Sequence, residues 1–219
     1  MSFLKGKMVL ITAGPTYERI DDVRFIGNFS SGKMGFALAE SALRMGAMVT
    51  LVTGPTCLYC SPAIDRIDIE SAEDMYQVVT ANSEKQDVII MSAAVADYTP
   101  KIKHNGKIKK KEDFMTIELV KTKDILKELG SKKKDNQIIV GFALESEKLL
   151  EYAKDKLERK NCNIIVANQA NSSDSGFGKD INTITIIDDK DNVKEVATAP
   201  KSEIADSILQ YVSIYSELP

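Results

Sequence analysis

Short apolar runs alternate with longer amphipathic stretches along most of the chain. Several of the apolar runs are apolar throughout, which is typical of strands covered on both faces. The strands that this pattern predicts are Met8–Thr12, Met48–Val52, Asp65–Ile69, Val88–Ser92, Gln137–Gly141 and Asn163–Val166. The amphipathic stretches predict helices over Gly35–Met45, Ala72–Ser83, Asp124–Gly130, Glu147–Lys160 and Lys201–Tyr215. Because this alternation builds βαβ units, we expect a parallel sheet with right-handed crossovers.

The last two apolar runs follow a different pattern. Thr183–Ile187 and Val193–Val196 are separated only by the polar residues 188–192, as in a β-hairpin. A chain of 219 residues is within reach of one large domain, and no internal repeat or low-complexity linker divides it. The predicted fold class is therefore α/β, with one domain over residues 1–219. Its core is a Rossmann-like, doubly wound, mostly parallel sheet with a C-terminal β-hairpin addition.

One segment, Tyr98–Asp113, is strongly basic and fits neither pattern. It contains an Asn-Gly turn at residues 105–106 and six lysines, at positions 101, 103, 107, 109, 110 and 111. Most charge runs are solvated loops, and this is one interpretation of the segment. The other is a flexible flap that brings lysines over a bound anion. The sequence alone leaves both open.

The amino-acid composition disfavours several classes of protein for this chain. Apolar residues make up 43% of the chain and charged residues 28%, with a net charge of -3, so neither nucleic acid nor an anionic membrane is an expected partner. No apolar run is long enough for a signal peptide or a membrane span, so a cytoplasmic location is expected. Three cysteines, an odd and sparse number, favour a reducing compartment. Cys57-x-x-Cys60 lacks two further ligands nearby, so no metal site is assigned to it.

The first strand, loop and helix form a candidate phosphate site. Ligands of open α/β sheets lie beyond the carboxyl ends of the strands, and free N–H groups at a helix N-terminus attract phosphate. Small residues before the helix allow a close approach to the backbone, and a lysine adds positive charge. The candidates are Gly14, Ser30, Ser31, Gly32 and Lys33. The alternative is that Ser30 or Ser31 only caps the helix.

Two familiar nucleotide motifs do not fit this segment. Residues 27–33 match G-x-x-x-x-G-K, but Met34 follows where a phosphate loop has Ser or Thr. The dinucleotide fingerprint G-x-G-x-x-G is absent after the first strand. Tyr152 and Lys156 have the spacing of the catalytic pair in short-chain dehydrogenases, which is common by chance on helices. An NAD(P)-dependent reductase therefore remains an alternative, as does a non-catalytic nucleotide-sensing module.

Other strand ends carry further candidates. The small residues from Ser92 leave room for a ligand, and Asp97 could contact ribose hydroxyls or Mg²⁺, or cap a helix. Phe142 could stack on a base, although core packing is the usual role of a phenylalanine there. Lys156 and Lys160 share one helix face, directed either to solvent or to phosphates.

An ordered series of motifs resembles the phosphopantothenoylcysteine synthetase family, whose members act in coenzyme A biosynthesis. The series covers nearly the whole chain and is more specific than any single motif. It comprises Ala13-Gly14-Pro15-Thr16, residues 23–28, residues 30–35, residues 93–98, Lys107-Ile108-Lys109-Lys110, residues 140–142, Ala167-Asn168, and Gly176-Phe177 with Asp180 and Asn182. Many bacterial members are fused behind a flavin-dependent decarboxylase, and this chain resembles the free-standing form.

The resemblance implies a two-step ligation of 4′-phosphopantothenate and L-cysteine. CTP, the nucleotide that bacterial members use, would activate the acid as an acyl-cytidylate, with Mg²⁺ held mainly by the triphosphate. The family pattern assigns the acyl group to Asn28 and the triphosphate to Lys107. The nucleotide contacts that it implies are Ser92, Ala93, Asp97, Lys107, Asp124, Ile125, Leu126, Phe142, Lys156 and Lys160.

The resemblance also implies a homodimer in which the basic flap crosses between subunits. The chain departs from the family where Asn-Pro or Thr-Pro often precedes Asp124, because it has Thr122-Lys123 there. Proline at a helix start is pre-organised for the helix, so its loss affects the backbone pose at Asp124 and not Asn28 or Lys107.

Overall fold

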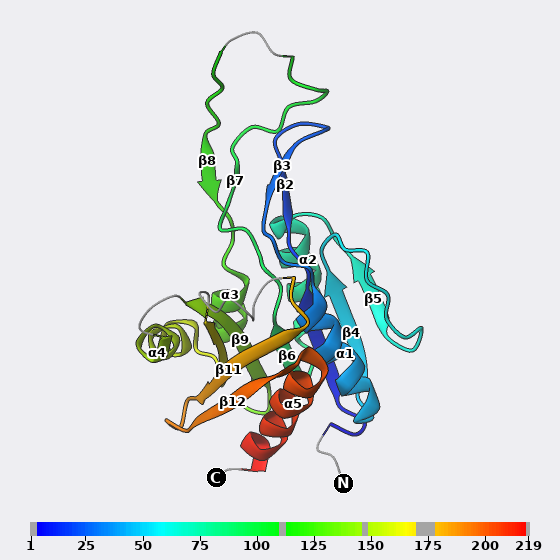
Figure 1. Cartoon of the computed structure of the whole chain (residues 1–219), viewed down its shortest axis with the longest axis vertical. Helices are drawn as coiled ribbons and strands as arrows, with labels where there is room; N and C mark the ends of the chain where they lie inside the picture. The colour runs from blue at the N-terminus through cyan, green and yellow to red at the C-terminus, as the bar shows by residue number, and fades with distance from the viewer. Residues whose placement is uncertain (1–3, 110–112, 146–148, 170–177, 218–219) are drawn as a thin grey trace.

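The structure of the protein is a computed structural model that describes residues 4–109, 113–145, 149–169 and 178–217 (Figure 1). In this part of the chain, one sheet of eight strands has the order β12-β11-β10-β9-β6-β1-β4-β5. Its parallel members are β1 (Met8–Ala13), β4 (Met48–Thr53), β5 (Asp65–Asp68), β6 (Val88–Met91), β9 (Ile138–Glu145) and β10 (Ile164–Gln169). The hairpin of β11 (Ile181–Asp188) and β12 (Val193–Pro200) adds two antiparallel strands.

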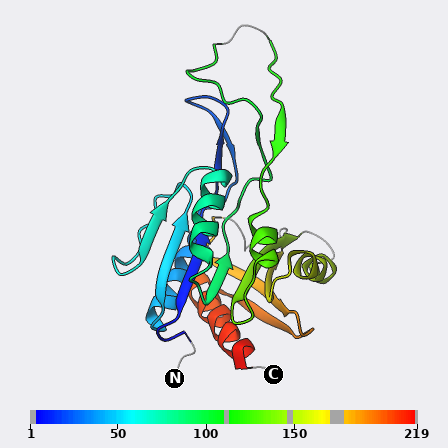
Figure 2. The same cartoon turned by 180° about the vertical axis from the view of Figure 1, so that it is seen from behind.

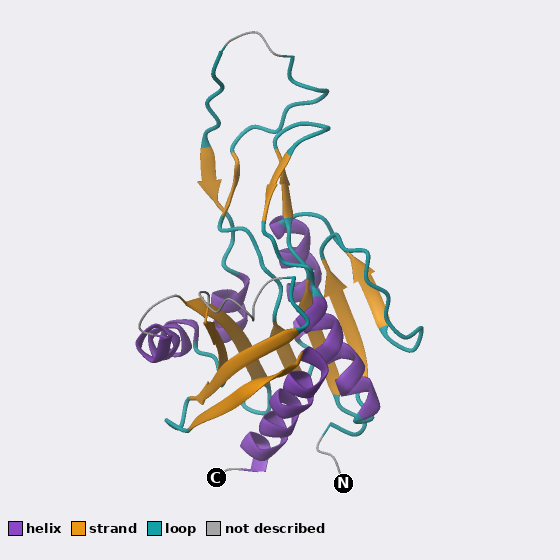
Figure 3. Ribbon diagram, in the orientation of Figure 1, coloured by secondary structure: helices purple, strands orange, loops and turns teal. Residues whose placement is uncertain are grey.

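Helices cover both faces of this sheet (Figures 2 and 3). On one face, α1 (Lys33–Arg44) and α5 (Lys201–Glu217) pack against a cluster that contains Ile11 and Ile90. On the other face, α2 (Ala72–Ser83), α3 (Ile125–Ser131) and α4 (Leu149–Lys160) pack against Leu10 and Ile89. Neighbouring residues of one strand thus enter opposite cores, as strand geometry requires. The predicted doubly wound fold with its terminal hairpin is confirmed.

The element boundaries differ slightly from those expected. The α2 helix has the predicted ends, whereas β9 runs past Gly141 to Glu145 and α5 runs past Tyr215 to Glu217. Four short strands were not predicted: β2 (Tyr17–Arg19), β3 (Phe25–Gly27), β7 (Tyr98–Pro100) and β8 (Leu119–Lys121). Each has three residues, too few to show a period. Among the residues that the structure describes, no helix is long and apolar enough to cross a membrane.

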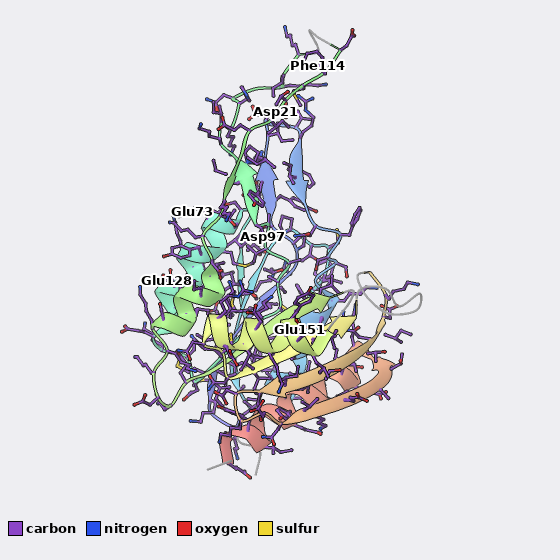
Figure 4. All side chains as sticks on the ribbon, turned by 90° about the vertical axis from the view of Figure 1, so that its left-hand side faces the viewer. Asp21, Glu73, Asp97, Phe114, Glu128 and Glu151 are labelled. Carbon is purple, nitrogen blue, oxygen red and sulfur yellow. The ribbon has the colours of Figure 1, made fainter. Side chains whose placement is uncertain are left out.

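These four strands carry a projection beyond the carboxyl ends of the parallel strands (Figure 1). It consists of the β2–β3 hairpin and of the arm, which we define as residues 98–121 and which is described at 98–109 and 113–121. The expected basic flap, Tyr98–Asp113, therefore forms the first part of a longer excursion that returns through β8. Figure 4 shows Phe114 near the far end of the projection and Asp97 at its base.

Asp21, between β2 and β3, joins the hairpin to the arm. Its carboxylate accepts hydrogen bonds from the backbone N–H of Ile108 at 3.0 Å and from the guanidinium of Arg24. Arg24 Nη2 also donates to the carbonyl of Ile108 at 3.1 Å, and the N–H of Gly106 donates to Asp22 at 2.7 Å. Because Arg24 and Ile108 stabilise the charged form, the pKa of Asp21 lies well below its usual range.

This low pKa predicts that acid loosens the arm. A depressed carboxylate pKa contributes stability above the unfolded value, and that contribution is lost as the pH falls toward the folded pKa. Amide exchange rates are compared after correction for the intrinsic effect of pH on the exchange reaction. We expect the corrected rate of the Ile108 amide to stay constant from pH 7 to pH 5 and to rise below about pH 4. Hydrogen exchange measured by mass spectrometry checks this, with Asp21→Asn expected to be fast throughout. A protected Ile108 amide in Asp21→Asn would contradict it.

Candidate functional site

The loops after β1 and β6 form the floor of the site. The chain passes from β1 through α1 to β4 on one side of β1, and it returns from β5 through α2 to β6 on the other side. Ligands of α/β sheets bind where the strand order reverses in this way. Thr12 joins the two strand ends, because its Oγ1 accepts from the N–H of Ala93 at 3.1 Å and its carbonyl from Ser92 Oγ at 2.5 Å. Further along, the N–H of Ala94 donates to the carbonyl of Gly14 at 2.9 Å. The floor is thus fixed by hydrogen bonds.

Helix α1 starts directly against this floor. A Cβ at Gly35 would lie 2.5 Å from the Cβ of Ala13 and 2.8 Å from Ser92 Oγ, so only glycine allows this approach. The helix begins after Gly32, whose φ of 81° is in the left-handed region, and no side chain caps it. The alternative role of Ser30 or Ser31 as the cap is therefore wrong. The first-turn N–H groups remain available to a ligand.

Two adjoining cavities lie above the strand ends. The smaller, about 320 Å³, is lined by Asn28, Ser30, Ser31, Gly32, Lys33 and Ser92, among others. The larger, about 500 Å³, is lined by Asp124, Ile125, Leu126 and Lys160, among others. Both are bordered by Ala93, Val95, Asp97, Phe142 and Lys156. Apart from Gly14 and Lys107, the fold brings every candidate site residue from the sequence to one or both cavities. Gly14 lies beneath them, within contact distance of Gly32.

Asn28 is exposed at the edge of the smaller cavity, directly after β3. Its Nδ2 donates to the carbonyl of Ala94 at 3.0 Å, which ties the amide to the loop after β6. This bond uses one N–H of the amide, so Oδ1 and the second N–H remain available to a ligand. Asn28 can therefore accept a hydrogen bond from a ligand and donate one to it.

The larger cavity has a charged wall from α3 and α4. Lys160 pairs with Asp124, the N-cap residue of α3, which also accepts from the N–H of Lys127 at 3.0 Å. Burial opposes the charge of Asp124, but the hydrogen bonds from Lys160 and Lys127 lower its pKa overall. Lys156 Nζ donates to the carbonyl of Phe142 at 2.7 Å. These lysines line the cavity and are not directed only to solvent.

Phe142 and Asp97 border both cavities. Phe142 is half-buried, since it packs against the core beneath α1 and α5 and also lines both cavities. Asp97 is exposed and starts no helix, which excludes the capping alternative. Its backbone carbonyl accepts from the N–H of Thr122 at 3.0 Å, so it lies where the arm leaves and returns (Figure 4).

Lys107 lies apart from both cavities of its own chain. Its neighbours Gly106 and Ile108 donate backbone hydrogen bonds to Asp22 and Asp21 of the hairpin. Neither cavity has Lys107 in its lining.

Three polar side chains in the lining of the smaller cavity were not assigned a role from the sequence: Asn168 at the end of β10, Asn182 in β11 and Lys201 at the start of α5. Asn168 Oδ1 is buried and has no hydrogen-bond partner among the described residues. The two asparagines belong to the motifs Ala167-Asn168 and Asp180-x-Asn182, so these motifs could have identified them as candidate site residues. Lys201 belongs to no such motif. It reaches the cavity because the antiparallel strands β11 and β12 bring the start of α5 back to the carboxyl ends of the parallel strands.

The positions of Tyr152 and of the possible metal ligands bear on two alternatives, a reductase and a metal site. Tyr152 is 46% exposed and lines neither cavity, so the fold does not bring it to the site with Lys156. Among the described residues, no group of three or more His, Cys, Asp or Glu side chains is placed to hold a metal ion. Cys57 and Cys60 are free thiols in the loop between β4 and β5. Residues Gly176 and Phe177 of the resembling motif lie outside the described residues.

Comparisons with known proteins identify one family and relatives from that family. Residues 4–215 match the family described as "DNA/pantothenate metabolism flavoprotein C-terminal domain". The chain is 46% identical over 215 residues to the coenzyme A biosynthesis bifunctional protein CoaBC of Bacillus subtilis (strain 168), covering 98% of this chain and 53% of that protein. It is 43% identical over 210 residues to CoaBC of Borreliella burgdorferi, covering 95% and 53%. The chain thus spans about half the length of these relatives.

Solved structures share the fold. A crystal structure of the C-terminal domain of CoaBC superposes with a TM-score of 0.82 at 44% identity, covering 96% of each chain. Cab2 mutant H337A in complex with phosphopantothenate-cysteine has a TM-score of 0.76 at 17% identity, covering 96% of this chain and 87% of that one, which shows a common fold.

Proposed function

Because the chain belongs to the DNA/pantothenate metabolism flavoprotein C-terminal domain family, we propose that it is a CTP-dependent phosphopantothenate–cysteine ligase of coenzyme A biosynthesis. This membership confirms the resemblance inferred from the ordered motifs. The observation that carries the proposal is the position of Asn28, tied to Ala94 at the edge of a cavity that also contains the open N-terminus of α1. An amide and a phosphate-binding helix start thus face one space.

The reaction has two displacements. In the first, a carboxylate oxygen of 4′-phosphopantothenate attacks the α-phosphorus of CTP, and the bond to the β-phosphate oxygen breaks with release of pyrophosphate. In the second, the amine of L-cysteine attacks the acyl carbon, the bond to CMP breaks, and the nitrogen loses a proton. Both substrates of the first step are anions, so donors and cations that neutralise them lower its barrier.

We assign the substrates to the two cavities by their linings. The larger cavity takes the cytidine, with Phe142 against the base, Asp97 near the ribose, and the start of α3 with Lys160 around them. The triphosphate runs along the N-terminus of α1 past Ser30, Ser31, Gly32 and Lys33. Asn28 binds the acyl group beside the α-phosphate. The assignment of Lys107 to the triphosphate of a partner subunit also belongs to this proposal.

Magnesium accompanies the triphosphate in this proposal. Asp97 is the carboxylate that the linings of both cavities share, and no cage of several carboxylates surrounds it in the described part of the chain. This arrangement fits Mg²⁺, which keeps several waters and binds through substrate phosphates and one or two carboxylates. When bound, the ion supplies positive charge at the phosphates.

A homodimer in the cytoplasm completes the proposal. The projection exposes large apolar side chains, among them Val23, Ile102, Phe114 and Met115, and Phe114 is 77% exposed. Several large apolar side chains exposed on one projection favour an interaction site there. A second copy of the chain would cover this surface and would bring its Lys107 toward the neighbouring cavities.

The assay is direct. The chain is incubated with phosphopantothenate, cysteine, Mg²⁺ and CTP, and pyrophosphate, CMP and the amide product are measured. We expect all three in equal amounts, and less product with ATP. No turnover with either nucleotide would exclude the ligase. Turnover that depends on NADPH would favour the reductase, and CTP binding without turnover would favour a sensor.

A further inference from the structure

The loop between β4 and β5 carries two cysteines that the proposed function does not use. Cys57 is exposed, Cys60 is half-buried, and both are free thiols. Their Cys-x-x-Cys spacing is one at which neighbouring thiols form an intramolecular disulfide. The third cysteine, Cys162, is buried, and burial raises its pKa to about 12, which makes it inert. The loop pair is therefore the part of the described chain that is open to thiol chemistry.

A guanidinium lies beside this pair. Arg66 Nη1 donates to the carbonyl of Leu58, between the two cysteines, at 2.8 Å. The pKa of Arg66 is raised chiefly by its hydrogen bond to Asp68, and contact with the Cys60 thiol adds to the rise. A positive charge beside a sulfur stabilises the negative charge that the sulfur carries when it attacks a disulfide. Arg66 is thus placed to assist exchange at Cys60.

The backbone around the pair is free to change its path. Residues 55–60 make no backbone–backbone hydrogen bond with any residue that the structure describes. Tyr59, between the cysteines, is 94% exposed, while Leu58 and Cys60 pack at the edge of the core beneath α1. A disulfide requires two Cα atoms about 4.4–6.8 Å apart, so closing it draws the residues between the cysteines into a tight turn. No backbone ladder has to break for this turn to form.

The first part of the same loop contacts the start of α1. Thr56 Oγ1 donates to the carbonyl of Ser31 at 3.3 Å and accepts from the N–H of Leu58 at 3.2 Å. Ser31 lines the smaller cavity. A Cβ at Gly54 would lie 1.7 Å from the carbonyl oxygen of Pro15, so the loop begins pressed against the floor of the site. Because Gly54 is held there, a turn closed between the cysteines shifts Thr56 relative to Ser31.

We propose that Cys57 and Cys60 form a redox site that exchanges with cystine, and that their disulfide weakens nucleotide binding at the smaller cavity. The thiolate of Cys57 attacks one sulfur of cystine, the S–S bond breaks, and one cysteine leaves as its thiolate. The thiolate of Cys60 then attacks the sulfur of Cys57, and the second cysteine leaves. Two protein thiols are oxidised, one cystine is reduced to two cysteines, and the two thiol protons end on those cysteines.

The choice of cystine rests on the proposed function, in which L-cysteine is a substrate. By mass action, the bridged fraction rises with the concentration of cystine and falls with the square of the concentration of cysteine. The disulfide thus forms when the supply of cysteine has been oxidised, and it opens when cysteine is abundant. In a reducing compartment, disulfides are typically transient and redox-sensing in this way.

The first test treats the full chain with cystine and follows its mass and its cysteine-containing peptides. We expect the loss of two hydrogens between Cys57 and Cys60, and no change at Cys162. Cys60→Ser should stop after the first step and keep one cysteine attached to Cys57. Cys57→Ser should react about tenfold more slowly, because its remaining loop thiol is half-buried. No bridge in the unmodified chain, or a bridge that includes Cys162, would overturn the site.

Two variants of the guanidinium separate its charge from its packing. Arg66→Gln should slow the second step several-fold, so that the mixed disulfide on Cys57 accumulates. Arg66→Lys keeps the charge and should restore most of the rate. Closure at the unmodified rate in Arg66→Gln would contradict the role of Arg66.

The second test measures CTP binding by calorimetry without added thiol. We expect the bridged chain to bind CTP several-fold more weakly than the reduced chain, and Cys57→Ser to keep its affinity after brief treatment with cystine. Equal affinities of the bridged and reduced chains would overturn the coupling to the cavity. A chain that forms the bridge but binds no CTP in either state would refute the ligase and keep the redox site. An active ligase whose loop thiols do not react with cystine would do the reverse.

Discussion

Replacing Asn28 by aspartate is expected to stop product formation almost completely. The new carboxylate would lie beside the carboxylate of phosphopantothenate, and like charges at this distance repel each other. It would also lose the N–H that donates to Ala94, so the loop after β3 would be held less firmly. We expect the rate of amide formation to fall by about 10²–10³ or more, as for the loss of a preorganised donor. Coupled detection of pyrophosphate and the amide measures the effect.

The matched control is Asn136→Asp. Asn136 is exposed in the loop before β9, at the opposite end of the parallel strands, so the variant adds the same charge without touching the cavities. We expect its activity to stay within about twofold of the unmodified chain. CTP binding should survive in Asn28→Asp, because the cytidine lies in the larger cavity. Amide formation at the normal rate in Asn28→Asp would refute the assignment of Asn28.

Replacing Lys107 by glutamine should slow the first displacement specifically. A lysine contact to the triphosphate neutralises charge that develops as pyrophosphate leaves, and its loss typically costs about 10²–10³ in rate. We expect single-turnover release of pyrophosphate to slow by this factor. The second displacement, started from added acyl-cytidylate and cysteine, should keep its rate. Unchanged pyrophosphate release in Lys107→Gln would show that the lysine has another role.

Mixing the two variants distinguishes sites within one chain from sites shared between chains. Lys107 lies on the arm, away from the cavities of its own chain, so the proposed dimer places it at the partner's cavity. A heterodimer of Asn28→Asp and Lys107→Gln would then contain one intact site. Random exchange of subunits should restore about a quarter of the unmodified activity. No recovery, with exchange verified by native mass spectrometry, would refute the shared site.

The periodicity of the sequence predicted the layered fold because strands that are buried on both faces are apolar along their length, and helices that cover a sheet are amphipathic. Strand β6 is continuously apolar, β1 is apolar except for Thr12, and α1 carries a clear amphipathic pattern. The strands of the projection show no such pattern in the sequence. They are only three residues long and partly exposed, and their pairing depends on distant segments, as β7 with β8.

The candidate site was predictable where motifs lie at strand ends. Ser92 follows β6 and Phe142 lies in the last part of β9, and the carboxyl ends of these parallel strands share one edge of the sheet. Asn28 follows β3 of the projection, and its hydrogen bond to Ala94 ties it to this edge. Lys201 could not be found in this way. It follows the antiparallel hairpin, and its sequence neighbours show no ligand-binding pattern. Only the register of β11 against β10 brings it within reach of Lys33.

The hydrogen bonds between Asp21, Asp22 and the arm have a mechanical consequence. Strand β3 ends one residue before Asn28, and the turn that leads into it is bonded to the residues on either side of Lys107. In the proposed dimer, a tilt of this hairpin would shift Asn28 in one cavity and Lys107 in the other at the same time. Occupancy of one site would therefore bias the geometry of its twin, and the two would not fill independently.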